Sequence, residues 1–333
     1  MKRREFLKKT TLTAGAISAG IIAEKVGAMG NKNATQESMK EPGRIPMRQY
    51  GKSDVKLSVI GFGGIVVMGN EQEQANKLVS EAFERGVNYY DVAPTYGDGE
   101  AEIKLGPALE PYRKKSFLAC KTAEREYGPA KKEFERSLKR LRTDYFDLYQ
   151  LHAITDVEKD VDTVFGKGGT MKLLIEAKKA GQIRHLGFSA HSHEAALAAM
   201  GRYDFDSILF PVNFANYYKG GFGLEVIKAA KEKEVAILAL KMFARQQWPK
   251  DAPTRERYSK CWYQPITDRE QAKLVMAFTL SQPVTAAVPP GDEALFRLAM
   301  DLAMEYEPIT QVQTEKVKSL AMGLNPIFEH KKA

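Results

Sequence analysis

Residues 89–97 read YYDVAPTYG, and the interpretation of the whole chain depends on this stretch. Its first half has the composition of a buried strand, which ends at Pro94. An acid, Asp91, stands near the end of that strand, and Tyr96 follows five positions later on a loop. Such an acid either caps the next helix or belongs to a functional site. The pattern of the remaining chain has to decide between these two interpretations.

The chain has 333 residues, of which 44% are hydrophobic and 28% are charged, values typical of a globular protein. Most of the formal net charge of +8 lies at the start, because residues 1–44 contain nine basic and four acidic residues. The remaining 41 basic and 38 acidic residues contribute only +3. No basic stripe with interleaved aromatic residues occurs there, so the sequence does not indicate nucleic-acid binding.

Residues 1–30 resemble a bacterial twin-arginine signal peptide. Arg3 and Arg4 precede a mildly apolar run of 14 residues from Thr10 to Ala23. This run is shorter than the roughly 20 residues that span a bilayer, so no stable membrane span is expected. A helix lying on the membrane surface is the alternative. The resemblance implies export of the folded protein by the twin-arginine machinery to the periplasm or another extracytoplasmic location.

A polar linker, residues 31–46, precedes a regular alternation of strand-like and helix-like segments. Strands are predicted at 57–64, 88–94, 116–122, 145–153, 183–190, 207–213, 235–241 and 284–290. Each strand is followed by a helical stretch, among them 71–87, 168–181, 193–202, 221–234, 268–282 and 292–306. Eight such units over about 250 residues predict a (β/α)₈ barrel at 47–306, with a tail, 307–333, packed on it. A doubly wound sheet is the competing fold, but GFGG at 61–64 lacks its usual G-x-G-x-x-G spacing.

Side-chain alternation along the predicted strands brings three polar residues to one rim of the barrel. Asp91, Lys121 and His152 stand at the carboxyl ends of three consecutive strands, with inward-facing side chains. Tyr96 lies on a loop that can fold over them. Barrel enzymes place their chemistry at this rim. Each residue alone has an ordinary structural explanation, but the four together favour a catalytic site over a helix cap.

These four side chains form a coherent set for proton transfer. A tyrosine with an ordinary pKa of about 10 is a weak acid near neutral pH. The ammonium group of Lys121 favours the phenolate of Tyr96, and Asp91 keeps that lysine charged. His152 can donate a hydrogen bond to a substrate oxygen. The set therefore predicts a site that protonates a carbonyl group while the carbonyl carbon receives a hydride.

From about residue 47 to residue 306 the chain resembles an aldo-keto reductase. The motifs that carry this resemblance occur in the order RQYGKSDVKLSVIGFGG, YYDVAPTYG, LACKT, YQLHA and LGFSAH. The resemblance implies a barrel that transfers hydride between NADP or NAD and a small carbonyl or alcohol. It also implies that Tyr96 is the acid/base, that Lys121 and Asp91 tune it, and that His152 orients the substrate.

The cofactor contacts implied by the resemblance are less regular. The candidate residues are Gly64, Ser189, Asn213, Lys241, Gly291, Asp292 and Arg297. Ser189 stands where the family contacts the nicotinamide carboxamide, and Lys241 stands near the pyrophosphate. Where many relatives hold the 2′-phosphate of NADP with a Lys-Ser pair and an arginine, this chain has Gly291-Asp292 and Arg297. An aspartate there repels a phosphate, which makes NAD a rival to NADP.

Several other features of the sequence are weaker candidates for a site. Cys120 and Cys261 make no disulfide or metal framework and are expected to be free thiols. His191-Ser192-His193 lacks acidic or thiol partners, so an exposed loop is predicted rather than a metal site. The long loop 243–267 contains Trp248, Trp262 and Tyr263, which predicts an apolar or sugar-binding surface.

Two alternatives to a reductase stay open from the sequence. One is a barrel that binds the cofactor as a redox sensor or scaffold and turns over little. The other is a hydrolytic barrel that uses Asp91 and His152 with a metal ion, although the chain offers no convincing ligand set.

Overall fold

Eight parallel strands form a ring in the computed structural model, which describes residues 43–330. In sheet order they are β12 (Ala286–Ala287), β9 (Ala236–Leu240), β8 (Ser207–Pro211), β7 (Ile183–Ala190), β6 (Phe146–Ile154), β5 (Phe117–Thr122), β4 (Tyr89–Asp91) and β3 (Phe62–Gly63). Ile60 bridges Ala287, and the Gly61 N–H donates to the Ala287 carbonyl at 2.9 Å, which joins the two ends of the sheet. The (β/α)₈ barrel predicted from the sequence is therefore confirmed.

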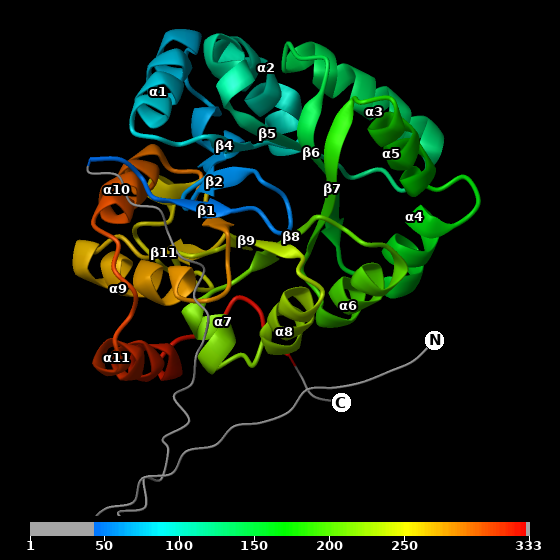
Figure 1. Ribbon diagram of the computed structural model, residues 1–333. Helices are drawn as coiled ribbons and strands as arrows, with labels where there is room; N and C mark the ends of the chain where they lie inside the picture. The colour runs from blue at the N-terminus through cyan, green and yellow to red at the C-terminus, as the bar shows by residue number, and fades with distance from the viewer. Residues whose placement is uncertain (1–42, 331–333) are drawn as a thin grey trace, which may run out of the picture. The chain divides into compact units, whose positions relative to one another are not determined.

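Helices surround the strands as an outer layer, as Figure 1 shows. The helices that follow the eight strands in turn are α1 (Gln72–Glu84), α2 (Glu100–Leu109), α3 (Tyr127–Arg140), α5 (Thr170–Lys179), α6 (His193–Arg202), α8 (Leu224–Glu232), α9 (Arg269–Leu280) and α10 (Glu293–Met304). Shorter elements are α4 (Thr163–Phe165), α7 (Phe214–Tyr218) and the hairpin strands β10 (Ala244–Gln246) and β11 (Gln264–Pro265). A final helix, α11 (Gln311–Met322), packs against α7 and α9.

The first predicted strand, 57–64, is wrong as a single element. Its start forms β2 (Lys56–Ser58), which pairs antiparallel with β1 (Met47–Gln49), and only β3 belongs to the barrel. Gly61 lies between the two pieces, where an added Cβ would be 2.5 Å from the Tyr89 ring. The chain can pass this close to the second barrel strand only because the residue has no side chain.

The hairpin β1–β2 covers the amino ends of the barrel strands and lies across the middle of the ring in Figure 1. The ring of Tyr50, which follows β1, lies 5.1 Å from that of Phe117 and 5.2 Å from that of His185. Its hydroxyl donates to Ser207 Oγ at 2.7 Å. These partners lie at or near the starts of β5, β7 and β8, so one end of the barrel is closed and only the carboxyl end is left for a site.

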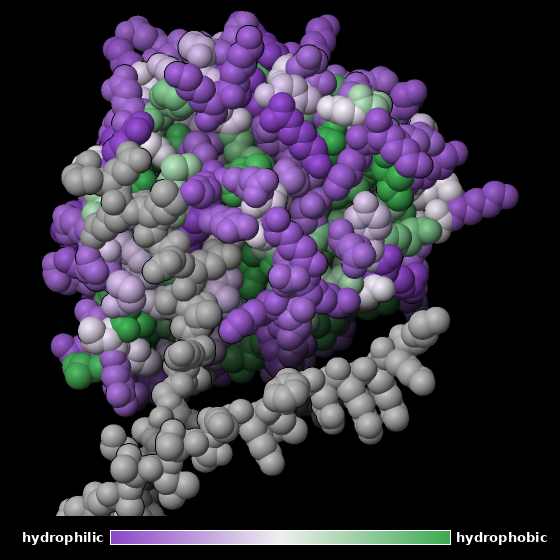
Figure 2. Space-filling model, viewed as in Figure 1, coloured by the Kyte–Doolittle hydropathy of each residue, from purple (hydrophilic) through white to green (hydrophobic). Residues whose placement is uncertain are grey.

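Two apolar layers follow from the alternation of side chains along each strand. Residues that point inward fill the barrel, among them Tyr89, Ala119, Leu148, Leu209 and Leu238. Their neighbours along the strands point outward and pack under the helices. The surface seen in Figure 2 is mostly hydrophilic, with small scattered apolar areas.

The predicted signal peptide, 1–30, and the linker up to residue 42 lie outside the described residues. Between residues 43 and 330, no helix has both the length and the apolar character needed to cross a membrane.

Candidate active site

Lys121 connects the predicted site residues at the carboxyl end of the barrel. From the end of β5, its Nζ donates to Asp91 Oδ2 at 2.5 Å and to the Tyr96 hydroxyl at 3.1 Å. The lysine is fully buried and Asp91 is almost so. The ring of His152 lies 5.9 Å from that of Tyr96 and nearly perpendicular to it. The structure thus brings together the four residues that the sequence singled out.

Two further residues hold Asp91 in place. Its Oδ1 accepts hydrogen bonds from the Tyr89 hydroxyl at 3.3 Å and from Gln150 Nε2 at 3.2 Å. Neither residue is among the site residues predicted from the sequence. The signal was present, because Tyr89 precedes Asp91 by two positions and Gln150 precedes His152 by two, so each shares its inward face.

Burial and charge oppose each other at the phenol and the amine. Burial raises the pKa of Tyr96, and the charge of Lys121 lowers it, with a net rise. The lowering by lysine expected from the sequence is present, but burial outweighs it. Burial lowers the pKa of Lys121, but the charge of Asp91 more than compensates, so its pKa rises. The site therefore holds a protonated phenol beside a charged ammonium group.

Both histidines near the site are neutral at physiological pH. Burial, followed by the charge of Lys121, lowers the pKa of His152 to about 3. Burial and the charge of Lys241 lower the pKa of His191 to about 4. A neutral His152 carries one N–H, so it can donate a hydrogen bond without bringing a charge.

A cavity of about 250 Å³ opens beside these residues. Its walls come from segments far apart in the sequence: Asp91, Tyr96, Lys121, His152, Ser189, His191, Lys241, Lys260, Trp262, Tyr263 and Pro289–Gly291 are among the lining residues. Lys260 and His191 had no assigned role in the sequence analysis. Lys260 lies on the long loop 243–267, where residue periodicity gives no information about side-chain direction.

Two of the seven cofactor candidates form a structural unit. The side-chain oxygen of Asn213, Oδ1, caps α7. Its side-chain nitrogen, Nδ2, donates to the backbone carbonyls of Lys241 at 3.0 Å and Ala244 at 2.6 Å. These contacts use all the hydrogen-bonding capacity of the Asn213 side chain. Asn213 therefore positions the turn of Lys241, whose side chain lines the cavity.

The candidates after β12 lie at the start of α10. Gly291 lines the cavity, and Asp292 caps the helix by accepting from the Leu295 N–H at 3.1 Å. Arg297 donates to Glu81 Oε2 at 2.9 Å and to Glu293. Its guanidinium group is thus already engaged with two carboxylates. Of the other two candidates, Ser189 lines the cavity and Gly64 is buried directly beside Gly63, which lines it.

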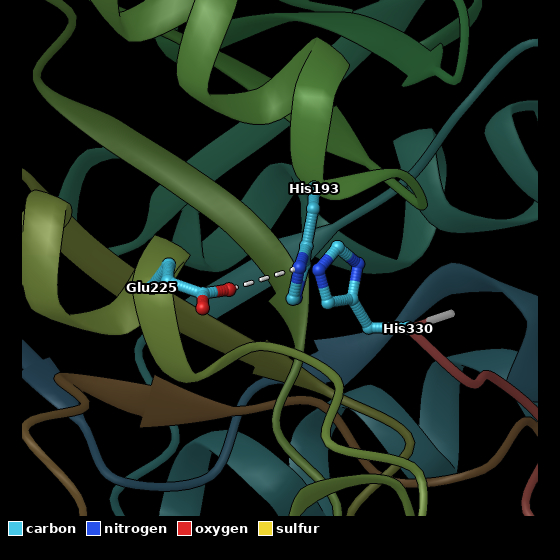
Figure 3. A group of neighbouring side chains, drawn as sticks. All are labelled: His193, Glu225 and His330. Carbon is cyan, nitrogen blue, oxygen red and sulfur yellow. Dashed lines mark ion pairs between the residues drawn. The ribbon is translucent and has the colours of Figure 1, made fainter. Parts of the chain in front are cut away.

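The prediction of an exposed loop at residues 191–193 is wrong. His193 begins α6 with only 2% of its surface exposed. The centre of its ring lies 4.1 Å from that of the His330 ring, with the two rings tilted by 40°, and Figure 3 shows the two side chains next to each other. Its Nδ1 faces Glu225 at 3.3 Å, while the Gly223 N–H donates to its Nε2. The two ring nitrogens of His193 thus face different partners. The contacts among His193, Glu225 and His330 join the segment around His330 to α6 and α8. Both cysteines are buried free thiols, as expected.

The sequence model of the Aldo/keto reductase family matches residues 59–261. The chain belongs to this family. A relative from Bacillus subtilis (strain 168), named uncharacterized oxidoreductase YqkF, is 35% identical over 155 residues, which are 43% of this chain and 48% of the relative. The matched part of the chain thus spans about half the length of this curated relative.

Solved structures of two aldo-keto reductases share the fold. AKR11C1 from Bacillus halodurans, in its holo form, has a TM-score of 0.64 and 24% identity, covering 84% of this chain and 98% of that one. An aldo-keto reductase from Klebsiella pneumoniae, in complex with NADP and acetate, has a TM-score of 0.64 and 17% identity, covering 88% and 99%. At these identities the likeness supports the fold.

The low pKa of His152 predicts a specific dependence of stability on pH. Its pKa is about 3 in the folded protein against 6.5 when unperturbed, so the unfolded state binds the extra proton first as pH falls. Between pH 6.5 and pH 3, His152 therefore lowers the free energy of unfolding by up to about 1.4 kcal/mol for each pH unit of acidification. The variant His152→Gln is expected to flatten the dependence of the unfolding free energy on pH between about 6 and 4, measured by urea denaturation. Equal slopes in the two proteins would contradict the neutral, buried imidazole.

Proposed function

We propose that this protein is an NAD(P)-dependent oxidoreductase that transfers hydride between the nicotinamide cofactor and a small carbonyl or alcohol, with Tyr96 as the acid/base. Family membership supports the reaction class, since the aldo/keto reductase family generally carries out NAD(P)H-dependent oxidoreduction of carbonyls. The observation that carries the residue assignment is the 3.1 Å contact between the Tyr96 hydroxyl and the buried Lys121 ammonium group.

The chain's own residues move and hold the proton. In the reductive direction the Tyr96 hydroxyl donates its proton to the substrate oxygen. The Lys121 ammonium group stabilises the phenolate that remains, because it already contacts that oxygen and stays charged through Asp91. His152 orients the substrate oxygen through an N–H hydrogen bond. In the oxidative direction the same phenolate takes the proton from an alcohol.

The cavity fits a nicotinamide cofactor through the chemistry of its donors. Lys260 supplies positive charge to its wall, and the Ser189 hydroxyl also lines it. Ser189 Oγ accepts from the Ala153 N–H at 2.7 Å, which leaves its proton available for a ligand acceptor. Gly291 exposes backbone at the start of α10, where helix N–H groups favour an anion. When bound, the nicotinamide supplies or accepts the hydride.

Charge at the start of α10 favours NAD over NADP. The first turn of this helix contains Asp292 and Glu293, and Arg297 is already paired with Glu293 and Glu81. If the cofactor lies as the family resemblance implies, its adenosine end meets two carboxylates and an engaged guanidinium group. The two carboxylates repel a 2′-phosphate placed there. NADP is the alternative cofactor for this chain, since the aldo-keto reductase from Klebsiella pneumoniae was solved in complex with NADP.

A cofactor-binding sensor or scaffold with little turnover is the second candidate from the sequence. The contact between Tyr96 and Lys121 argues against this candidate, because cofactor binding alone does not require a buried phenol–ammonium pair.

Replacing Tyr96 tests the acid/base assignment. The variant Tyr96→Phe is expected to lower kcat by about 10²–10⁴-fold on an aldehyde panel, because it lacks the transferable proton. Its cofactor affinity, measured by nicotinamide fluorescence, should stay within about threefold of the wild type. The control is Tyr127→Phe, since the Tyr127 hydroxyl donates to Glu176 at the surface, away from the cavity, and this variant should keep full turnover. A wild-type protein that binds the cofactor but reduces no carbonyl would instead indicate the scaffold.

Replacing Asp292 tests the cofactor preference. Asp292→Ser keeps a helix-capping oxygen and removes the negative charge. We expect NADPH binding to tighten by about three- to tenfold, which corresponds to about 0.7–1.4 kcal/mol, with little change for NADH. The matched control is Asp268→Ser, which replaces an equivalent cap on α9 and should change neither affinity. Equal effects on both cofactors would contradict the assigned position of the 2′-phosphate.

We further propose export through the twin-arginine route, with residues 1–30 as the signal, 31–46 as the linker, 47–306 as the catalytic barrel and 307–333 as a packed tail. The pair Arg3-Arg4 supports the route.

Lysine substitutions at this pair test the export proposal. A reporter fused to residues 1–30 should reach the periplasm, and replacing both arginines by lysine should retain it in the cytoplasm. The control exchanges Lys8 and Lys9 for arginine, which keeps the charge and should leave export intact. Export of the Arg3→Lys, Arg4→Lys fusion at the wild-type level would exclude the twin-arginine route.

A further inference from the structure

The cavity beside the proposed acid/base carries an excess of positive charge. Among the described residues that line it, three are lysines, Lys121, Lys241 and Lys260, and one is a carboxylate, Asp91. Asp91 is paired with Lys121. The ammonium groups of Lys241 and Lys260 therefore face the cavity, and no carboxylate among the lining residues is left to pair with them.

Lys241 is the more deeply placed of these two lysines. Within residues 43–330, no carboxylate lies within ion-pair distance of its Nζ, which instead lies 5.2 Å from the ring centre of Trp262 and 5.3 Å from that of Tyr263. Burial, aided by the charge of Lys121, lowers the pKa of Lys241 to about 8. At neutral pH the group is still mostly protonated. Aromatic faces compensate only part of the cost of a desolvated cation, so the cavity is suited to an anion.

The backbone at Lys241 is held in an unusual conformation. Its φ of 67° lies in the left-handed region, which costs a residue with a side chain about 1–3 kcal/mol. Asn213 Nδ2 and the Ala244 N–H both donate to the Lys241 carbonyl, at 3.0 and 2.9 Å. These hydrogen bonds fix the turn that directs the side chain into the cavity. A surface lysine needs no such support.

Lys241 and Lys260 face different parts of the cavity. The charge of Lys241 acts on both His152 and His191, beside the proposed reaction centre. Lys260 donates to the Val66 carbonyl at 3.0 Å and interacts electrostatically with Asp292 and Glu293 at the start of α10. Lys260 thus lies toward the start of α10, where the phosphates of the cofactor are expected, and Lys241 lies toward His152 and His191.

We propose that Lys241 binds an anionic group of the substrate, so that the protein acts on carbonyl compounds that carry a carboxylate or a phosphate. This inference rests on the proposed function of the site and adds a substrate class to it. The family resemblance placed Lys241 near the pyrophosphate of the cofactor, which is the other source of an anion. Because both sources offer the same chemistry to an ammonium group, the experiment has to separate them.

Matched aldehydes test whether the anion belongs to the substrate. The probes are 2-, 3- and 4-carboxybenzaldehyde, each paired with the neutral formylbenzamide of the same shape, so that the series also varies the distance between carbonyl and charge. For at least one isomer we expect the wild type to prefer the acid by about tenfold or more in kcat/KM. In Lys241→Met, which keeps the length of the side chain but not its charge, this preference should disappear through a higher KM. Turnover of the amides should stay within about threefold.

The control variant is Lys260→Met. It should weaken cofactor binding, measured by nicotinamide fluorescence, and leave the ratio of acid to amide unchanged. The wild-type preference for the acid should also decline as pH rises through about 8, where Lys241 loses its proton. Lys241→Met should bind the cofactor as the wild type does. If instead it loses cofactor affinity and reduces acids and amides equally poorly, the lysine serves the pyrophosphate and the proposal is wrong.

A binding measurement separates this proposal from the proposed function. Benzoate should quench the fluorescence of Trp262 in the wild type, with Trp262→Phe as the assignment control, and not in Lys241→Met. Quenching that depends on Lys241, in a protein that reduces none of the aldehydes, would refute the reductase function and support the anion site. Reduction of the amides and acids alike, without such quenching, would support the reductase and overturn the anion site.

Discussion

The buried ion pair between Lys121 and Asp91 is the constraint on which the site depends. Two charges removed from water are tolerated only when they are closely paired and their remaining hydrogen-bonding atoms are satisfied. Here the carboxylate also accepts from Tyr89 and Gln150, and the ammonium group donates to the Val92 carbonyl. Loss of one partner from such a pair typically costs about 3–5 kcal/mol. The pair therefore fixes the positions of β4 and β5 relative to each other and holds the amine against the phenol.

The ion pair also sets the protonation of its surroundings. Burial, with the ammonium charge adding to it, keeps His152 neutral. The same charge stabilises the phenolate of Tyr96 once the proton has left. Burial dominates at Tyr96, and the phenol stays protonated. This combination suits a proton donor whose conjugate base is stabilised during the reaction rather than before it.

The mouth of the cavity is built by parts of the chain that have no regular pattern. The long loop contributes Trp262 and Lys260. Phe328 lies 5.9 Å from the ring of Trp262 and 5.3 Å from that of His191. The contact between the rings of His193 and His330 joins this segment to α6. Two residues that line the cavity, Trp262 and His191, therefore pack against the segment that contains Phe328.

The sequence by itself determined the barrel and the four residues Asp91, Tyr96, Lys121 and His152. Alternation along a strand fixes which side chains point inward, and the carboxyl ends of parallel strands meet at one rim. Tertiary structure alone decided that β2 leaves the barrel, that His193 is buried, and that Arg297 is engaged with carboxylates. It also decided that Lys241 has no carboxylate partner among the described residues. Such facts depend on contacts between segments far apart in the chain, and no local periodicity encodes which charge meets which partner.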